Sequence, residues 1–255
     1  RNEHQRKEEQ KNQMSTLESY QWPWPPGLSP FAHQKETTKF IVSRPKAFVF
    51  NEQGTGKTAS VIWASDYLMN MGLVKRVLIV CPLSIMHSAW QQDLFKFAVH
   101  RKVDVAYGSA NKRKDIIRKG TAEYVVINFD GVQICKAEII NGGFDLVVID
   151  EASAYKNAQT DRWKTMRDVM KHIKGLWMLT GTPAAQSPVD AYGLAKLVNP
   201  SGVPTFFGQF RDSVMMQVTQ YRWMPKPNST QIVHKALQPA IRFEKAQCID
   251  LPDVM

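Results

Sequence analysis

Two glycines, a lysine and a threonine lie close together in the segment KAFVFNEQGTGKT. Gly54 and Gly56 have no side chains, so backbone N–H groups beside them can approach phosphate oxygens. Lys57 would place a positive charge on the terminal phosphates, and the Thr58 hydroxyl would hold Mg²⁺. A β-prone run precedes the glycines and a helix-compatible run follows, so the positive end of the helix dipole would face the same place. The segment therefore predicts a phosphate-binding loop.

This loop departs from the full GxxxxGK[ST] pattern at Asn51, where the first glycine is expected. Because the shorter pattern is less specific, a glycine-rich turn before an ordinary amphipathic helix remains the alternative. Upstream, the Phe31 ring can stack on adenine, and the Gln34 amide can donate to a ring nitrogen and accept from the amino group. We therefore expect these residues to bind the nucleotide: Phe31, Gln34, Gln53, Gly54, Thr55, Gly56, Lys57 and Thr58.

Two adjacent acids follow an apolar run in the segment FDLVVIDEAS. The run predicts a buried strand that delivers Asp150 and Glu151 to the carboxyl edge of a sheet. Two carboxylates there are costly without a cation, which beside a phosphate loop is most simply Mg²⁺ on ATP. We expect Lys57, Asp150 and Glu151 to be catalytic, with Asp150 holding the metal directly or through water and Glu151 orienting and deprotonating the attacking water. The alternative is a loop in which Glu151 merely caps a helix.

A third polar motif, Thr180-Gly181-Thr182-Pro183, follows the apolar run 176–180. Its two hydroxyl side chains are predicted at the same sheet edge as the acids. They could relay contacts between the acidic pair and a bound polymer. A plain tight turn uses Gly and Pro as well, so the motif means little without the other two.

Short apolar runs alternate with helical segments throughout the middle of the chain. This alternation predicts an α/β fold, a doubly wound and mostly parallel sheet with right-handed crossovers and helices on both faces. Ligands of such sheets bind at the carboxyl ends of the strands. The predicted strands are 48–50, 76–81, 103–107, 124–128, 145–150 and 176–180. After the second of them, Ser84 is expected to cap a helix with Trp90, Leu94 and Phe97 on one side.

The 255 residues carry a formal net charge of +10, with a sequence pI near 9.5. Such a charge favours polyanionic partners, although it does not separate nucleic acid from simple solubility. Basic residues concentrate between Lys96 and Lys119, either on a solvated helix face or at phosphate contacts. The three cysteines form no CxxC pair, so we expect buried thiols without structural zinc. No membrane span and no signal peptide are expected, and we predict an intracellular protein, cytoplasmic or nuclear.

The two ends of the chain are less regular. The first 19 residues are polar and predict a frayed helix or a tail, and a Pro-rich linker follows. Trp22 and Trp24 in that linker either form a partner motif or, as we favour, pack back on the domain. Towards the other end, FFGQFRDSVMMQV predicts a helix. The following YRWMPKPNST predicts a polar, turn-rich surface loop, with nucleic-acid contact as the alternative.

With the three motifs in this order, the chain resembles the first RecA-like lobe of superfamily 2 helicases and translocases, most closely the Swi/Snf-related group. NEQGTGKT is similar to that group's DEMGLGKT loop, and DEASAYKN to its DEAHRIKN motif. CPLSIMHSAW resembles the segment with Pro, Ser and Trp after the second strand. LTGTPAAQSPVDAYGLAKLVNP is similar to LTGTPLQN and the helix after it. The departures are Ser153, where the family often has His, and His33, where an aromatic residue is common.

The resemblance implies a P-loop NTPase fold and ATP hydrolysis, with Mg²⁺, coupled to tracking along nucleic acid, usually double-stranded DNA. After the polar segment and Trp/Pro linker at 1–27, it implies an ATP-binding lobe at 28–240 and the start of a linker to a second lobe at 241–255. After Thr182 the sequence shows no second glycine loop and no arginine-bearing segment like that of the second lobe. We therefore expect an amino-terminal part of a longer motor, which alone would bind ATP weakly and hydrolyse it slowly or not at all.

Contacts to the phosphate backbone of DNA are expected from strand-edge loops, without reading of bases. The expected contact residues are Pro82, Ser84, Gly108, Ser109, Thr180, Gly181 and Thr182. Thr180, Thr182 and Gln186 are expected to couple the nucleotide site to the polymer. Two alternatives remain: a lobe of a strand-separating DNA or RNA helicase, and a nucleotide-gated nucleic-acid-binding module without catalysis. The intact Lys57 and acidic pair argue against the second, because binding alone needs no general base.

Overall fold

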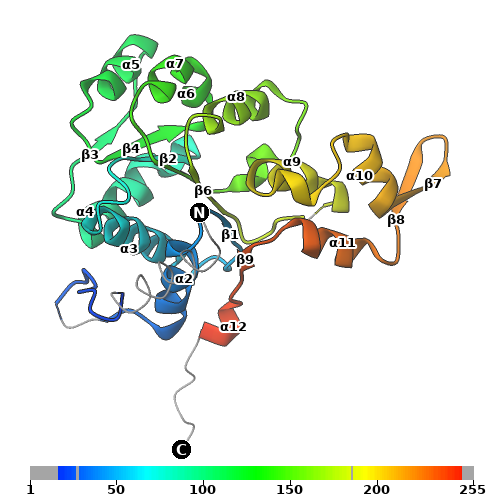
Figure 1. Cartoon of the computed structure of the whole chain (residues 1–255), viewed down its shortest axis with the longest axis horizontal. Helices are drawn as coiled ribbons and strands as arrows, with labels where there is room; N and C mark the ends of the chain where they lie inside the picture. The colour runs from blue at the N-terminus through cyan, green and yellow to red at the C-terminus, as the bar shows by residue number, and fades with distance from the viewer. Residues whose placement is uncertain (1–16, 27–28, 185, 249–255) are drawn as a thin grey trace, which may run out of the picture.

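A single seven-stranded sheet forms the centre of the molecule (Figure 1). The computed structural model describes residues 17–26, 29–184 and 186–248. Its strands are β1 (Lys46–Val49), β2 (Val77–Cys81), β3 (Val103–Val105), β4 (Tyr124–Asn128), β5 (Leu146–Ile149), β6 (Gly175–Leu179) and β9 (Ala240–Ile241). They lie in the order β3-β4-β2-β5-β6-β1-β9, and every pairing within this sheet is parallel. The predicted parallel α/β sheet is confirmed.

Helices cover both faces of the sheet because successive side chains of each buried strand point to opposite sides. On β2, Leu78 and Val80 belong to one core cluster, whereas Val77 and Ile79 belong to the other. The first cluster is completed by α5 (Ala110–Lys119), α6 (Phe129–Ile134), α7 (Lys136–Ile140), α8 (Asp161–Met170), α9 (Ala191–Val198), α10 (Phe207–Val214) and α11 (Ser229–Ala236). The second is completed by α2 (Ala32–Val42), α3 (Lys57–Asn70) and α4 (Gln92–Phe97).

The segment after β2 differs from the predicted single helix. Leu83–Ile85 forms a 3₁₀ turn, and the π-helix η2 (Met86–Gln91) separates it from α4. Ser84 lies inside the 3₁₀ turn, and Pro82 takes the preceding position, so Ser84 as helix cap is wrong. The expected apolar side of this segment is confirmed, because Trp90, Leu94 and Phe97 are all buried.

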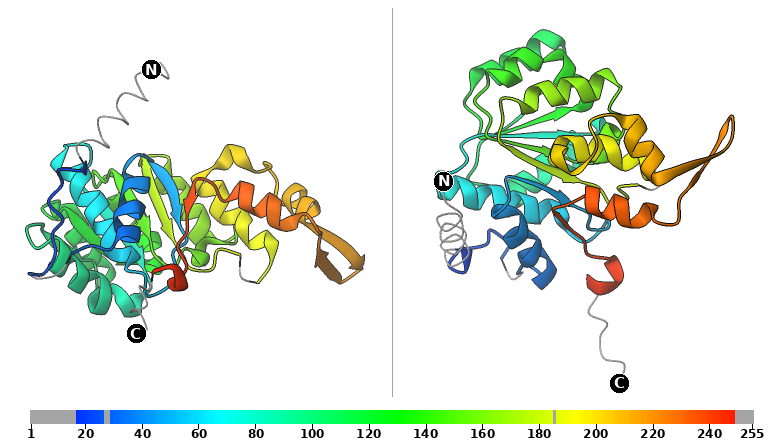
Figure 2. Two further views of the ribbon diagram at one scale, coloured as in Figure 1. Left: turned by 90° about the horizontal axis from the view of Figure 1, so that it is seen from below. Right: turned by 45° about the vertical axis from the view of Figure 1, so that its right-hand side comes forward.

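A two-stranded hairpin replaces the end of the helix predicted in the region 206–234. The helix α10 ends at Val214, and β7 (Met215–Thr219) pairs antiparallel with β8 (Arg222–Pro225). The segment MMQVT therefore forms a strand and not the end of the predicted helix. The turn-rich loop predicted for YRWMPKPNST is wrong, because this segment forms β8 and the start of the helix at Ser229, but its predicted surface position holds, since most hairpin residues are exposed. The hairpin extends away from the sheet in every view (Figures 1 and 2).

The described part of the Trp/Pro linker packs on the domain, as favoured from the sequence. The Trp22 and Trp24 rings lie 5.4 and 5.1 Å from that of Trp63 on α3. The Trp63 indole N–H donates to the carbonyl of Pro23 at 2.8 Å. The helix or tail predicted for the first residues lies, up to residue 16, outside the described residues. No helix in the described ranges is long and apolar enough to cross a membrane.

Candidate functional site

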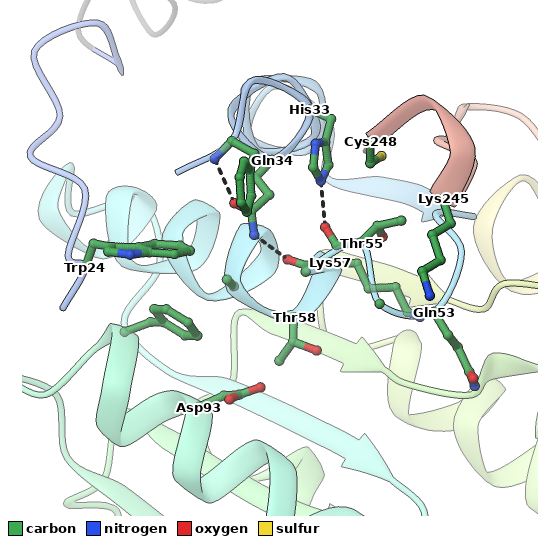
Figure 3. A pocket seen from close by; sticks show the side chains of 15 residues that line it. Trp24, His33, Gln34, Gln53, Thr55, Lys57, Thr58, Asp93, Lys245 and Cys248 are labelled. Atoms are coloured by element: carbon green, nitrogen blue, oxygen red, sulfur yellow. Dashed lines mark hydrogen bonds between the residues drawn. The ribbon is translucent and has the colours of Figure 1, made fainter. Parts of the chain in front are cut away.

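A cavity of about 590 Å³ lies where α2, the loop after β1 and the start of α3 meet (Figure 3). It is lined by every residue that the sequence predicted to bind nucleotide: Phe31, Gln34, Gln53, Gly54, Thr55, Gly56, Lys57 and Thr58. The remaining lining residues are Trp24, His33, Ala59, Asp93, Phe97, Lys245 and Cys248. The two groups come from five separate stretches of the chain, and the fold brings them to one place.

The glycine loop has the backbone that a phosphate-binding loop requires. Gly54 and Gly56 have φ angles of +80° and +71°, in the left-handed region that favours glycine. A Cβ on Gly56 would lie 2.2 Å from the Gln34 side-chain nitrogen, so the close approach also needs glycine. The helix α3 begins at Lys57 without an acid in its first turn. Its free N–H groups and positive dipole end therefore remain available to an anion.

Two side chains of α2 hold this loop from above. The Gln34 amide donates to the Gly56 carbonyl at 3.2 Å and accepts from the Phe31 N–H at 2.9 Å. The His33 Nε2 lies 2.8 Å from the Thr55 carbonyl oxygen. Gln34 is only 3% exposed, so in this arrangement its amide braces the loop (Figure 3). Phe31 is 57% exposed at the rim, which leaves its ring available for stacking.

Asn51, the departure from the glycine-loop pattern, has a structural use. Its amide nitrogen donates to the Thr37 hydroxyl at 2.9 Å, and its oxygen accepts from the Phe243 N–H at 3.0 Å. Asn51 is fully buried, and both ends of its amide are satisfied. This side chain therefore ties the phosphate loop to α2 and to the segment after β9. A second bond there joins Glu52 to the Lys245 N–H at 2.8 Å.

Sequence reasoning missed several lining residues, because no local pattern marks them. Asp93 lies one turn after Trp90, and burial raises the pKa of its carboxyl despite the opposing charge of Lys96. Lys245 on α12 (Lys245–Cys248) extends toward the loop (Figure 3). The buried Trp24 indole nitrogen has no hydrogen-bond partner among the described residues. The cavity thus has a cation, a half-buried acid and an indole ring that the motifs did not indicate.

The acidic pair follows β5, two strand positions from β1 in the same sheet. Neighbouring strands are about 4.8 Å apart, so the two loops leave the sheet roughly 10 Å from each other. Gly181, after the intervening β6, lies close to the phosphate loop: a Cβ there would be 3.8 Å from the Glu52 Cα. The three predicted motifs therefore share one edge. Asp150 and Glu151 do not line the cavity of Figure 3, and Glu151 borders a neighbouring cavity with Thr182 and Gln186.

Glu151 is the described non-glycine residue with a positive φ angle, at +51°. Such a left-handed residue costs about 1–3 kcal/mol and persists only where its surroundings enforce it. It precedes the 3₁₀ turn Ala152–Tyr155, and its side chain makes no capping bond. The capping alternative for Glu151 therefore finds no support. Glu151 is partly exposed and lines the second cavity.

The third motif and the segment before α9 each make polar contacts. Thr180 is 1% exposed, and its hydroxyl accepts from the Thr182 N–H at 3.3 Å, so it supports the loop from inside. Thr182 itself is exposed. The Lys156 ammonium donates to the Gln186 side-chain oxygen at 2.9 Å and reaches Asp190 at 3.3 Å. Gln186 is thereby linked to the segment that follows the acidic pair.

The other expected nucleic-acid contacts lie at the same carboxyl edge, after β2 and β3. Ser84 is exposed beside Pro82. The Ser109 hydroxyl caps α5 by accepting from the Lys112 N–H at 3.3 Å, and the Gly108 carbonyl accepts from Arg113 at 2.7 Å. Part of the basic cluster between Lys96 and Lys119 is used internally, since Arg101 pairs with Asp66 and Arg118 with Glu138. Its exposed lysines are Lys96, Lys102, Lys112 and Lys119.

Known proteins resemble this chain in sequence and in fold. The INO80 chromatin-remodeling ATPase of Sclerotinia sclerotiorum is 28% identical over 163 residues, covering 59% of this chain and 9% of that protein. An uncharacterized ATP-dependent helicase of Mycoplasma pneumoniae is 32% identical over 198 residues, covering 73% and 18%. The Sulfolobus solfataricus SWI2/SNF2 ATPase core in complex with dsDNA has a TM-score of 0.69 at 20% identity, covering 92% of this chain and 49% of that one.

The structural likeness confirms the predicted RecA-like fold. This chain spans less than a fifth of the length of the two relatives described above, and about half of the solved ATPase core. A family model, that of the SNF2-related domain, matches residues 33–247. That match covers the phosphate loop, the acidic pair, the TGTP motif and most of the α/β sheet, so the chain belongs to the SNF2-related domain family.

Proposed function

We propose that the chain is the ATP-binding first lobe of a DNA-dependent ATPase that translocates on nucleic acid or remodels nucleic-acid complexes. The observation that supports this most is the cavity of Figure 3, which gathers all eight residues expected to bind nucleotide. The relatives support the reading, because they are named as a chromatin-remodeling ATPase and an ATP-dependent helicase. The family also suggests an intracellular location, cytoplasmic or nuclear.

The residues at the site fit ATP and Mg²⁺. The left-handed glycines leave room for phosphates, and Lys57 supplies a cation to the same cavity. The Thr58 hydroxyl and the Asp150 carboxylate are hard oxygen ligands, and Mg²⁺ on a nucleotide needs only one or two such protein ligands. When bound, Mg²⁺ would neutralise charge that develops on the phosphates. Glu151 would take the proton from the attacking water, and Lys57 would bind the terminal phosphates.

Double-stranded DNA is the proposed polymer. The exposed groups at the carboxyl edge, such as Ser84 and Thr182, can contact a phosphate backbone without reading bases. Gly108, Ser109 and Gly181 would contribute backbone groups, and Gln186 would couple the two sites through Lys156. We propose a second RecA-like lobe as partner, since an arginine from such a lobe would stabilise transition-state charge, an effect of about 10³–10⁵ in rate in related nucleotidases. Alone, the chain would bind ATP weakly and hydrolyse it slowly.

Paired variants test the nucleotide site on this chain. Lys57→Ala should lower the affinity for a fluorescent ATP analogue at least tenfold, because the charge on the terminal phosphates is lost. Glu151→Gln should leave that affinity within about twofold, because the proposed base acts only in hydrolysis. Lys174→Ala, on the exposed segment before β6 and outside the cavity lining, is the matched control for a lost lysine. Unchanged affinity in Lys57→Ala would contradict the proposed nucleotide site. Rapid DNA-stimulated hydrolysis by this chain alone would contradict the proposed need for a second lobe.

A further inference from the structure

The buried tryptophan Trp90 makes a hydrogen bond that is unlike those of the other buried indoles. Its Nε1–H donates to the Asp150 Oδ2 at 2.9 Å, and Trp90 is fully buried. Trp63, Trp163 and Trp177 are also buried, and each donates to a backbone carbonyl, at 2.8, 2.8 and 3.0 Å. Trp90 alone among these four donates to a carboxylate. A buried indole N–H needs one hydrogen-bond acceptor, and in the other three tryptophans a backbone carbonyl is sufficient. The carboxylate acceptor of Trp90 is therefore not required by burial alone.

The bond constrains the Asp150 carboxylate at both oxygens. Oδ1 accepts from the Glu151 N–H at 2.9 Å, and Oδ2 accepts from Trp90. The backbone N–H of Asp150 donates to Val80 on the neighbouring strand β2 at 2.8 Å. Rotation of the carboxylate about its terminal bond would break one of the two side-chain bonds. Each oxygen still has a second lone-pair site, so the carboxylate is oriented by these bonds and can still bind a cation.

The backbone that carries Trp90 also reaches the nucleotide cavity. Trp90 lies in the π-helix η2, and π-turns of this kind are frequent at functional sites. Directly after it, α4 contributes Asp93 and Phe97 to the cavity that Thr58 lines. Figure 3 shows Asp93 on the Thr58 side of that cavity. One short segment therefore contacts the proposed metal-binding acid and borders the proposed nucleotide site.

We propose that Trp90 is a positioning residue that orients the Asp150 carboxylate toward the Mg²⁺ of the bound nucleotide. The inference rests on the proposed function, because it requires a Mg²⁺–nucleotide site at Asp150. Hydrogen bonds to a ligating carboxylate fix its direction, and losing such a partner typically costs about 10- to 100-fold in metal affinity. The indole N–H thus acts through Asp150 and touches neither metal nor nucleotide.

The test is a Mg²⁺ titration of nucleotide binding with Trp90→Phe. The affinity for a fluorescent ADP analogue is measured in EDTA and at increasing Mg²⁺, which gives a midpoint without any hydrolysis. We expect unchanged affinity in EDTA and a Mg²⁺ midpoint about 10- to 100-fold higher than in the wild-type chain. Trp177→Phe is the matched control, because it removes a buried indole N–H that donates to the Arg44 carbonyl. The Mg²⁺ midpoint of this variant should equal that of the wild-type chain.

Two further measurements separate positioning from folding. In the Asp150→Asn background, Trp90→Phe should shift the midpoint by less than twofold, because its effect passes through that carboxylate. If Trp90→Phe unfolds, benzothienylalanine at position 90 keeps the ring shape and removes only the N–H. A midpoint within twofold of wild type in a folded Trp90 variant overturns the inference and leaves the proposed function standing. A wild-type chain without Mg²⁺-dependent nucleotide binding contradicts the proposed function and this inference together.

Discussion

At the scale of single residues, the site depends on positions where the residue type is fixed by its immediate surroundings. Gly56 combines a left-handed φ with a contact that a Cβ would make at 2.2 Å to the Gln34 side chain. Asn51 stands where the loop pattern has glycine, yet its buried amide satisfies two partners from distant segments. In this chain the loop therefore accommodates a side chain at its first position, Asn51, but not at Gly56.

Gly56→Ala should destabilise the chain more than its φ angle alone predicts. A left-handed alanine costs about 1–2 kcal/mol, and here Gln34 must also move and release the Gly56 carbonyl. Gly72→Ala is the matched control, because Gly72 has a similar φ of +70° and nothing within 4 Å of a new Cβ. Urea unfolding should show the larger loss for Gly56→Ala, together with weaker nucleotide binding. Equal losses in the two variants would remove the steric argument.

At the scale of elements, the functional edge is held by ties between segments that are distant in sequence. The segment after β9 returns to the phosphate loop, where the Glu52 N–H donates to the Phe243 carbonyl at 3.0 Å. Asn51 adds a bond from the Phe243 N–H and another to α2. The loop therefore lies between two elements that both bind its backbone or side chains. Its conformation is determined by packing on either side as well as by its glycines.

Asn51→Ala should loosen both ties at once. One buried and one partly buried bond are lost, so we expect a loss of about 2–4 kcal/mol in the free energy of unfolding. Hydrogen exchange should rise selectively at the amide of Phe243, which loses its acceptor. Asn141→Ala, which removes a single exposed side-chain bond to the Ala137 carbonyl, serves as control. Protection of the Phe243 amide that equals wild type would contradict the proposed tie.

A second element-scale prediction concerns α8, where Asp168 accepts bonds from Lys136, Arg167 and Lys171. These bonds hold the pKa of the Asp168 carboxyl below its usual range. Because the folded pKa is lowered, the stabilisation is complete above the unfolded value of about 3.9 and is lost as the pH falls below it.

Asp168→Asn should therefore be less stable than wild type in urea at pH 7, with a difference that narrows toward pH 3. Asp115→Asn removes one exposed i,i+3 partner of Arg118 and should show a smaller difference at pH 7. A gap between wild type and Asp168→Asn that stays constant from pH 7 to pH 3 would contradict the assignment.

At the scale of the whole molecule, the basic charge and the single functional edge lead to a prediction about DNA. Each phosphate contact contributes about −0.9 to the slope of log affinity against log salt, so even three contacts weaken binding about 40-fold between 50 and 200 mM salt. We expect a salt dependence at least this steep, and equal for duplexes of unrelated sequence, when binding is measured by fluorescence anisotropy. Lys57→Ala should keep it, because Lys57 lies in the nucleotide cavity. Flat binding over this range, or strong sequence preference, would contradict a backbone-tracking lobe.

The sequence by itself determined the local parts of this protein: the glycine loop, the apolar strands, the acids that end β5 and the α/β alternation. These features depend on neighbours along the chain, such as φ preferences and runs of buried side chains, so a linear pattern records them. The hairpin β7–β8 and the π-helix η2 escaped prediction, because short apolar stretches fit strand and helix alike.

Only the tertiary structure decided which distant groups meet at the site. Trp90 and Asp150 are 60 residues apart and Asn51 and Phe243 are 192 apart, so their bonds follow from strand order and helix packing. The entry of Trp24, Asp93 and Lys245 into the cavity has the same origin. Each of these residue types is ordinary in its local context. Their places arise because the fold brings distant segments together, and buried polar groups such as those of Asn51 and Asp150 find their partners there.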